Sequence, residues 1–130
     1  MLESEMRTTL IHLALVAALA CIAQPALARA AKNGVHGAIA LQRDTGRFGY
    51  AYAAATSRAA KLDALKQCAD PRCEVVVTFS NACGGLARDP ARGPKGYFAA
   101  KGATRQEAEA KALRLCAHRD CAITAWACTR

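Results

Sequence analysis

Cysteines carry the most definite chemistry in this sequence of 130 residues. Six of the seven lie in its second half: Cys68, Cys73, Cys83, Cys116, Cys121 and Cys128. Two pairs have four residues between them, a gap that suits a short disulfide loop and lies at the upper limit for zinc ligands. An even number of cysteines favours disulfides in an exported chain. We therefore expect disulfides, with no metal and no cofactor.

The chain offers few candidates for catalysis. After its first 28 residues, its serines are Ser57 and Ser80 and its histidines are His36 and His118. Ser57 stands where a helix is expected to begin, which is a common capping position. The acidic residues lie among lysines and arginines and not as a carboxylate pair suited to glycoside hydrolysis. We therefore expect a protein that is not an enzyme.

Two short basic motifs are the best candidates for binding. Both read Arg-Asp-x-x-Arg, at Arg43–Arg47 and at Arg88–Arg92, and Lys95 follows the second. The candidate binding residues are Arg43, Arg47, Arg88, Arg92 and Lys95. Arginine presents a planar fork of donors that suits carboxylates and phosphates, so the motifs could hold an anionic partner. The alternative is that they are ordinary polar turns in which arginine and aspartate form local ion pairs.

The elements that would position these residues are repeated. Gly49-Tyr50 matches Gly96-Tyr97 at an offset of 47 residues, and after one inserted residue an offset of 48 aligns the two Cys-x4-Cys segments. Matches in one order along most of the chain indicate an internal duplication. The repeats span about residues 35–82 and 83–130, within a single domain of residues 29–130.

Each repeat predicts two strands, a helix and a third strand. The expected strands are Val35–Leu41, Arg47–Tyr52, Glu74–Ser80, Gly84–Arg88, Lys95–Ala100 and Ala122–Cys128. Thr104 and Glu107 form a capping box at the second helix, and Thr56 or Ser57 caps the first. Alanines at four-residue spacing give each helix a narrow apolar face. The fold class is therefore α+β: a duplicated ββαβ unit with one antiparallel sheet or a pair of sheets, covered by two helices.

The last strand of each repeat has an alternating pattern. We expect Val75, Val77 and Phe79 to share one face of the first, with Ile123, Ala125 and Ala127 on the equivalent face of the second. Several of the chain's seven aromatic residues occupy strand positions that we assign to the core.

Repeat symmetry also predicts the disulfides: Cys68–Cys73, Cys116–Cys121 and Cys83–Cys128. The first two close the tight links between a helix and the strand that follows. The third joins the two cysteines that remain, each near the end of a repeat's last strand, and we expect it to tie the two repeats together.

The N-terminus reads as a signal peptide of residues 1–28. Leu10–Ala23 is uncharged and mostly apolar, and Ala26-Leu27-Ala28 ends in the small residues that a signal peptidase recognises. A lipoprotein anchor at Cys21 is the alternative, but the leucine that such a site requires is misplaced. After cleavage no membrane span is expected, and the protein is periplasmic or secreted.

The sequence resembles the bacterial domain of unknown function 4189. The resemblance rests on Gly37-Ala38-Ile39-Ala40, on the Gly-Tyr pair before each helix, on both Cys-x4-Cys links and on Asn81-Ala82-Cys83-Gly84. It covers nearly all of the chain after the leader. It implies an exported protein and brings no catalytic motif.

Charge gives the last indication of function. The net charge is +8, which favours an anionic protein or an anionic envelope polymer as partner. The chain has no nucleic-acid-binding motif, and export argues against that class of partner. We expect an exported non-catalytic binding protein of the envelope or extracellular space, of the inhibitor or immunity type. The alternative is a small hydrolase of cell-wall or surface polymers that uses Ser80 or His118.

Overall fold

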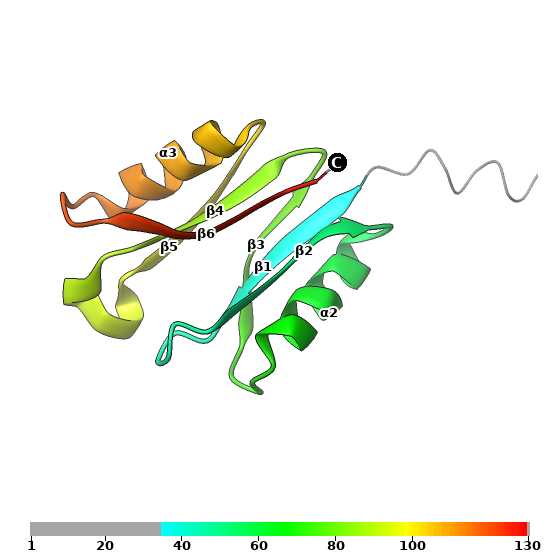
Figure 1. Cartoon of the computed structure of the whole chain (residues 1–130), viewed down its shortest axis with the longest axis horizontal. Helices are drawn as coiled ribbons and strands as arrows, with labels where there is room; N and C mark the ends of the chain where they lie inside the picture. The colour runs from blue at the N-terminus through cyan, green and yellow to red at the C-terminus, as the bar shows by residue number, and fades with distance from the viewer. Residues whose placement is uncertain (1–34, 130) are drawn as a thin grey trace, which may run out of the picture. The chain divides into compact units, whose positions relative to one another are not determined.

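A computed structural model of the chain describes residues 35–129. The expected signal peptide, its cleavage site and Cys21 lie outside these residues. None of the helices within them is long and apolar enough to cross a membrane. The elements, shown in Figure 1, are β1 (His36–Leu41), β2 (Phe48–Ala54), α2 (Ser57–Cys68), β3 (Glu74–Ser80), β4 (Cys83–Arg88), the 3₁₀ helix η2 (Pro90–Lys95), β5 (Tyr97–Gly102), α3 (Arg105–Cys116) and β6 (Ala122–Cys128).

The duplicated ββαβ arrangement is confirmed, and each repeat forms its own antiparallel sheet. The strand orders are β2-β1-β3 and β5-β4-β6, so the first strand of each repeat lies in the centre. Equivalent hydrogen bonds close the two sheets at the same end. Asn81 N donates to Val35 O at 3.0 Å in the first repeat, and Thr129 N donates to Ala82 O at 2.9 Å in the second.

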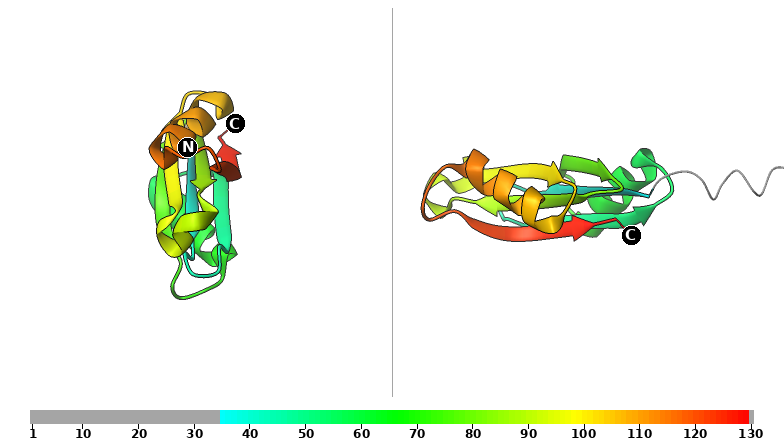
Figure 2. Two further views of the ribbon diagram at one scale, coloured as in Figure 1. Left: turned by 90° about the vertical axis from the view of Figure 1, so that its left-hand side faces the viewer. Right: turned by 90° about the horizontal axis from the view of Figure 1, so that it is seen from above.

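The two sheets pack face to face with a helix on each outer side. Along β1, Ala38 and Ala40 pack with α2, whereas Ile39 and Leu41 pack with residues of the other sheet. The layer between the sheets comprises Ile39, Leu41, Phe79, Leu86, Tyr97, Ala125 and Ala127. The strands of both sheets run along one common direction (Figure 2). Because one face of β1 packs on α2 and the other packs on the second sheet, β1 is apolar on both faces.

The predicted helix caps are present. Thr104 Oγ1 accepts from Glu107 N at 3.2 Å, and Glu107 Oε2 accepts at 3.1 Å from the N–H of Ala103, the residue before the cap, and not from Thr104 N as in a standard capping box. In the first repeat Thr56, not Ser57, is the N-cap residue. Glu107 also pairs with Lys111 at 2.7 Å, and these hydrogen bonds hold the pKa of its exposed carboxyl below the ordinary value.

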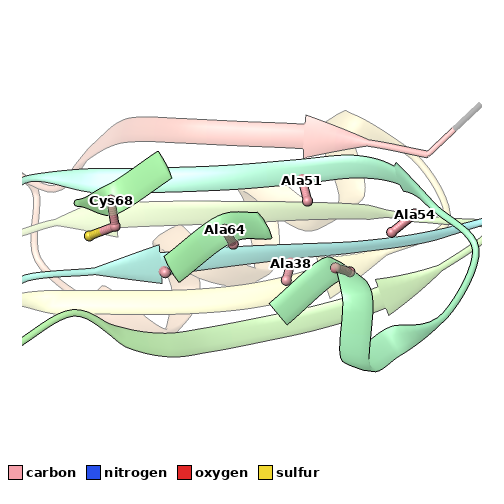
Figure 3. Close-up of a cluster of buried hydrophobic side chains, with 7 residues drawn as sticks. Ala38, Ala51, Ala54, Ala64 and Cys68 are labelled. Atoms are coloured by element: carbon pink, nitrogen blue, oxygen red, sulfur yellow. The ribbon is translucent and has the colours of Figure 1, made fainter. Parts of the chain in front are cut away.

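Small residues bring each helix close to its sheet. Ala60, Ala64 and Cys68 form the buried face of α2, which lies over Ala38, Ala51 and Ala54 (Figure 3). The equivalent face of α3 is Ala108, Ala112 and Cys116. Since alanine has only one side-chain carbon, the helix backbones can approach the strands closely.

The closest of these approaches is at Gly49. A Cβ atom there would lie 2.3 Å from Ala64 O and 2.3 Å from Cys68 N, both backbone atoms of α2. We expect Gly49→Ala to lower the free energy of unfolding by about 2 kcal/mol, because the helix must move away from the sheet. Urea denaturation measures the change. Gly85→Ala is the matched control, since its Cβ would lie at 3.2 Å from the nearest atoms of α3. An equal loss in both variants would contradict this explanation.

The predicted alternation along the last strands is wrong in one respect. Val75 packs against α2, whereas Val77 and Phe79 lie between the sheets. A β-bulge causes the change, because the register of β1 and β3 shifts by one residue between these positions. The second repeat has the same bulge, which places Ile123 against α3 and Ala125 between the sheets.

The second hairpin also differs from the prediction. Lys95 belongs to the 3₁₀ helix of the hairpin loop, and β5 begins only at Tyr97. Asp89 caps this helix, and its Oδ1 accepts from Ala91 N at 3.0 Å. The loop is therefore longer and more ordered than a simple turn.

The structure contains the three disulfides that the repeat symmetry predicts. The Cα–Cα distances are 6.3 Å for Cys68–Cys73, 6.2 Å for Cys116–Cys121 and 4.0 Å for Cys83–Cys128. The expected role of the third is wrong. Cys83 begins β4 and Cys128 ends β6, so the bond joins neighbouring strands of one sheet and does not tie the repeats together.

Candidate functional site

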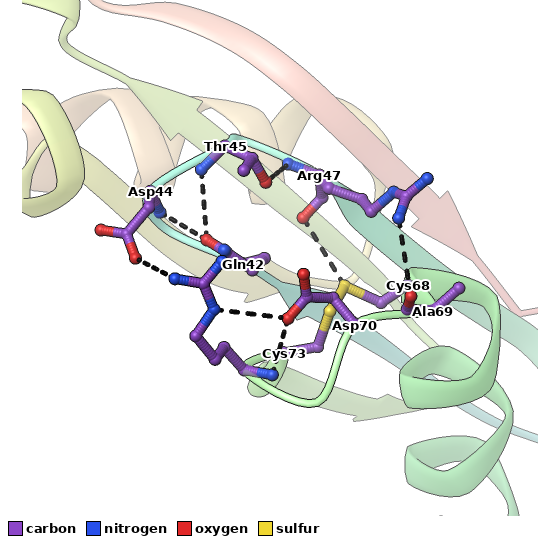
Figure 4. A network of polar contacts seen from close by, with 9 residues as sticks. Gln42, Asp44, Thr45, Arg47, Cys68, Ala69, Asp70 and Cys73 are labelled. Carbon is purple, nitrogen blue, oxygen red and sulfur yellow. Dashed lines mark hydrogen bonds and ion pairs between the residues drawn. A yellow bond between two sulfur atoms is a disulfide. The ribbon is translucent and has the colours of Figure 1, made fainter.

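The arginines of the first hairpin tip are engaged within the protein. Arg43 forms an ion pair with Glu74 on β3, and Arg47 Nη1 lies 3.5 Å from the carbonyl oxygen of Ala69. Asp44 forms an ion pair with Arg72, with 3.3 Å between Asp44 Oδ2 and Arg72 Nη1 (Figure 4). The tip is thus attached to the link that follows α2.

The arginines of the second tip also have local contacts. Arg92 Nε lies 3.2 Å from Asp89 Oδ2, and the Asp89 side chain is almost fully buried. The Arg88 guanidinium lies 5.4 Å from the centre of the Tyr97 ring. Lys95 is exposed, and no acidic partner is found for it among residues 35–129.

The two tips meet at Tyr97. A Cβ atom at Gly46 would lie 2.6 Å from Tyr97 Oη, and Arg43 lines a hollow of about 230 Å³ together with Tyr97. Arg88 stacks on the same ring. The contacts of the four arginines support the interpretation of polar turns with local ion pairs, and binding by Arg43, Arg47, Arg88, Arg92 and Lys95 stays a prediction.

The residues considered for catalysis do not form a catalytic set. His36 is the cross-strand neighbour of Ser80, but Ser80 Oγ donates to Val35 O at 3.3 Å. His118 lies in the Cys116–Cys121 link, where its Nδ1 accepts from Asp120 N at 3.3 Å. Within residues 35–129, no three His, Cys, Asp or Glu side chains are grouped to hold a metal ion.

A large hollow lies between the edge strands β2 and β6, and the sequence did not predict it. Its volume is about 610 Å³. One wall consists of Phe48, Tyr50 and Tyr52, which follow one another at every second position of β2. The other wall is β6 and the residue after it, from Thr124 to Thr129. We call this hollow the aromatic groove.

The aromatic side chains of the groove are exposed to solvent. The exposed fraction is 38% for Phe48 and for Tyr50, 41% for Tyr52 and 44% for Trp126. The rings of Tyr50 and Tyr52 stack with their centres 6.2 Å apart and their planes at 28°. Phe48, Tyr50 and Tyr52 share the inner face of β2, whereas Trp126, which lies between the inward-facing Ala125 and Ala127, points to the α3 side of β6. Exposed aromatic side chains are typical of interaction surfaces, which makes the groove the candidate binding site.

A cation stacks on Trp126 on the α3 side of β6. Arg105, the first residue of α3, places its guanidinium carbon 3.8 Å from the centre of the Trp126 ring. Arg105 Nε also lies 2.7 Å from Glu109 Oε1. The stacked guanidinium fixes the indole and places positive charge beside it.

The β6 wall presents free backbone groups. Among the strands of residues 35–129, β6 pairs only with β4, and no described strand covers its other edge. The Cα–Cα distance of 4.0 Å identifies Cys83 and Cys128 as a non-hydrogen-bonded pair, whose N–H and C=O groups point away from each other. Trp126 lies two positions before Cys128 and pairs with Gly85, so its backbone N–H and C=O groups have the same orientation as those of Cys128. The backbone groups of Trp126 and Cys128 therefore point outward from the sheet edge.

The groove occurs at one of the two positions that the duplication makes equivalent. In the two sheets Tyr50 and Ala99 take the same place, opposite Ile39 and Leu86 of the central strands. Phe48 takes the place of Tyr97, and Trp126 corresponds to Thr78 by the repeat offset. The equivalent hollow, between β5 and β3, is the one of about 230 Å³ beside Tyr97. Because the same arrangement of strands forms with Ala99 and Thr78 at two of these positions, it does not require the aromatic side chains of Tyr50 and Trp126.

The sequence predicts core positions for several of the seven aromatic residues and does not single out the four that are exposed. Phe79 and Tyr97 are buried, whereas Phe48, Tyr50, Tyr52 and Trp126 are exposed. The signal was present in β2, where small residues alternate with aromatic ones. Gly49 and Ala51 face α2, which leaves the aromatic side chains on the opposite face of an edge strand.

The chain was compared with known proteins. No curated protein and no solved structure gives a significant match. The family model for the domain of unknown function DUF4189 matches residues 36–128, which include all six strands and both helices described above. The paired Cys-x4-Cys links and the duplicated ββαβ unit lie within this match, and the chain therefore belongs to the DUF4189 family.

Proposed function

We propose that this protein is an exported, non-catalytic binding protein that holds its ligand in the aromatic groove. The observation that carries the proposal is the concentration of Phe48, Tyr50, Tyr52 and Trp126 in one of two equivalent positions of a duplicated fold. Exposed aromatic side chains weaken the solubility of a free protein, and they contribute strongly to binding when a partner covers them.

Three disulfides are typical of an oxidising compartment. Together with the signal peptide expected at residues 1–28, they support a place in the periplasm or outside the cell. The net charge of +8 supports an anionic partner, either a protein or an envelope polymer. A role as an inhibitor or immunity protein fits a small, rigid, stapled binding module.

A small hydrolase of cell-wall or surface polymers is the second candidate. The cross-strand pair of His36 and Ser80 favours it, because it places a hydroxyl beside an imidazole. The bond from Ser80 to Val35 O argues against it, since the hydroxyl proton is committed to the backbone. Hydrolysis of purified cell wall that is lost in Ser80→Ala or in His118→Ala would establish this candidate.

The binding proposal is tested by removing the aromatic wall. We expect Tyr50→Ser/Tyr52→Ser to weaken retention of the partner about tenfold or more, because the stacked rings are lost. The oxidised protein serves as bait for envelope and secreted fractions, and retained material is compared between variants. Salt should weaken the retention, because charges near a surface are screened over about 10 Å at 0.1 M.

Two control variants make this result specific. Leu62→Ser removes an apolar side chain from α2 that is 58% exposed and lies outside the groove. The combined change of Arg43, Arg47, Arg88 and Arg92 to serine tests the hairpin tips. If Leu62→Ser reduces retention as much as the groove variant, the groove is not the binding site. If only the arginine variant reduces it, the hairpin tips hold the ligand.

A further inference from the structure

We propose that the ligand of the aromatic groove is an extended, acidic polypeptide segment that pairs with the open edge of β6 as an additional strand. This inference rests on the binding function proposed above and specifies its partner. It follows from three features of residues 35–129: a strand edge that no described strand pairs with, an aromatic wall with the spacing of a strand, and a cation stacked on Trp126 of that edge strand.

The unpaired edge provides the main attachment. The N–H and C=O groups of Trp126 and Cys128 point outward and lie in the wall of the groove. An extended peptide satisfies such groups with its own backbone, which is the mode called β-strand addition. Among the described residues of the groove wall, the polar side chains are the hydroxyls of two tyrosines and two threonines, without carboxylates or amides. Recognition there thus depends mainly on the backbone.

The neighbouring edge strand is treated differently. The backbone N–H of Tyr50 on β2 is capped by the side-chain oxygen of Gln67 from α2. The cap closes β2 against pairing with another strand at this point, and the open edge of β6 is left as the site of addition.

The aromatic wall has the period of an extended chain. Phe48, Tyr50 and Tyr52 occupy alternate positions of β2, and the rings of Tyr50 and Tyr52 are centred 6.2 Å apart. Alternate side chains of an extended peptide lie about 6.6 Å apart on one face. A strand added beside β6 would therefore place every second side chain against one ring of this wall.

The position of β2 leaves room for such a strand. β2 contacts the opposite sheet through β6, the last strand of that sheet. The inner face of β2 consequently overlies the edge of the sheet, and its aromatic side chains stay partly exposed. A fourth strand after β6 would cover them and extend the face-to-face packing of the two sheets by one strand.

Charge determines the kind of peptide. Within residues 35–129, the groove wall has no ionisable side chain except the tyrosines, and the guanidinium of Arg105 stacks on Trp126 of the same edge strand. With a net charge of +8 on the whole chain, a segment with acidic residues beside its apolar ones is favoured.

The test uses a random heptapeptide library displayed on phage, selected on the oxidised protein, and a synthetic copy of an enriched peptide. Trp126 is the only tryptophan of the chain, so its fluorescence reports binding in the groove without a label. We expect enriched peptides to alternate apolar with polar or acidic residues. N-methylation at every second peptide amide should weaken binding about tenfold, and N-methylation at the intervening amides should have little effect.

Hydrogen exchange provides the second readout. In the free protein the amides of Trp126 and Cys128 should exchange fast, because they point out of the sheet edge. Saturation with the peptide should slow both about tenfold or more. The amide of Ala127 points toward β4 and should change little.

The outcomes separate this inference from the function on which it rests. If a peptide binds and loses affinity in Tyr50→Ser/Tyr52→Ser, but neither N-methylation nor exchange shows backbone pairing, strand addition is overturned and the groove remains a binding site. If N-acetylglucosamine oligosaccharides change Trp126 fluorescence and no peptide does, a glycan is the ligand and the inference falls. If the selected peptides bind the groove variant equally well, both proposals fail.

Discussion

Replacing Cys83 and Cys128 together by alanine is expected to lower the free energy of unfolding by about 4 kcal/mol. The bond joins residues separated by 45 positions, which makes it the longest disulfide loop among residues 35–129. A cross-link restricts the unfolded chain more strongly as the loop grows, so its removal gives the unfolded state more freedom than removal of a short loop. For a domain of this size the stability is of the order of 5–15 kcal/mol, and the loss is a large part of it.

Urea denaturation of the oxidised variants measures this effect. Cys68→Ala/Cys73→Ala is the matched control, because it removes a disulfide with a separation of five positions and should cost only about 2 kcal/mol. If the two double variants lose equal stability, chain entropy is not the main source of the stabilisation.

A disulfide between β1 and β3 is expected to raise stability by up to about 4 kcal/mol. The repeat offset relates Cys83 to His36 and Cys128 to Ser80, and those two residues are cross-strand neighbours in the first sheet. The backbone hydrogen bond just beyond each pair is also equivalent, from Asn81 N to Val35 O in the first sheet and from Thr129 N to Ala82 O in the second. The His36–Ser80 and Cys83–Cys128 pairs therefore occupy the same position in their sheets. His36→Cys/Ser80→Cys therefore has a natural template elsewhere in the same chain.

The engineered bond is assessed by mass spectrometry of non-reduced peptides and by the midpoint of thermal unfolding. The single variant His36→Cys, which has no partner thiol at position 80, is the control for loss of the imidazole. A midpoint that does not rise in the double variant, although the bond has formed, would show that the two ladder positions differ in geometry. The variant also removes the His36–Ser80 pair, so retained binding would count against a role for the pair in function.

The fold was predictable because it depends on local patterns that occur twice. The capping box at Thr104, the alanines of the two helices and the Cys-x4-Cys links each restrict a short segment, and the repeat doubles the evidence. The bulges of β3 and β6 were not predictable, because a bulge is a matter of register between strands distant in sequence. The role of Cys83–Cys128 was misjudged for the same reason, since it depended on which strand lies beside β6.

The candidate site was harder to predict than the fold. Charged residues such as Arg43 and Arg92 stand out in a sequence, but their ion pairs with Glu74 and Asp89 emerge only from the folded arrangement. Exposed aromatic residues are difficult to identify from a sequence, because a tyrosine that alternates with small residues on a strand has the same pattern as a core residue. The exposure of Tyr50 depends on β2 being the edge strand of its sheet, which is a property of the topology.

All hydrogen-bonded strand pairs among residues 35–129 join strands of one repeat. The halves meet only through side chains in the layer between the sheets, and the connection from β3 to β4 is the two residues Asn81 and Ala82. The backbone pairing within each half therefore does not depend on the other half. The aromatic groove does, because its two walls, β2 and β6, belong to different halves. The same division allows two copies of the chain to exchange halves: if the short connection straightens, the first half of one copy meets the second half of another through the native interface.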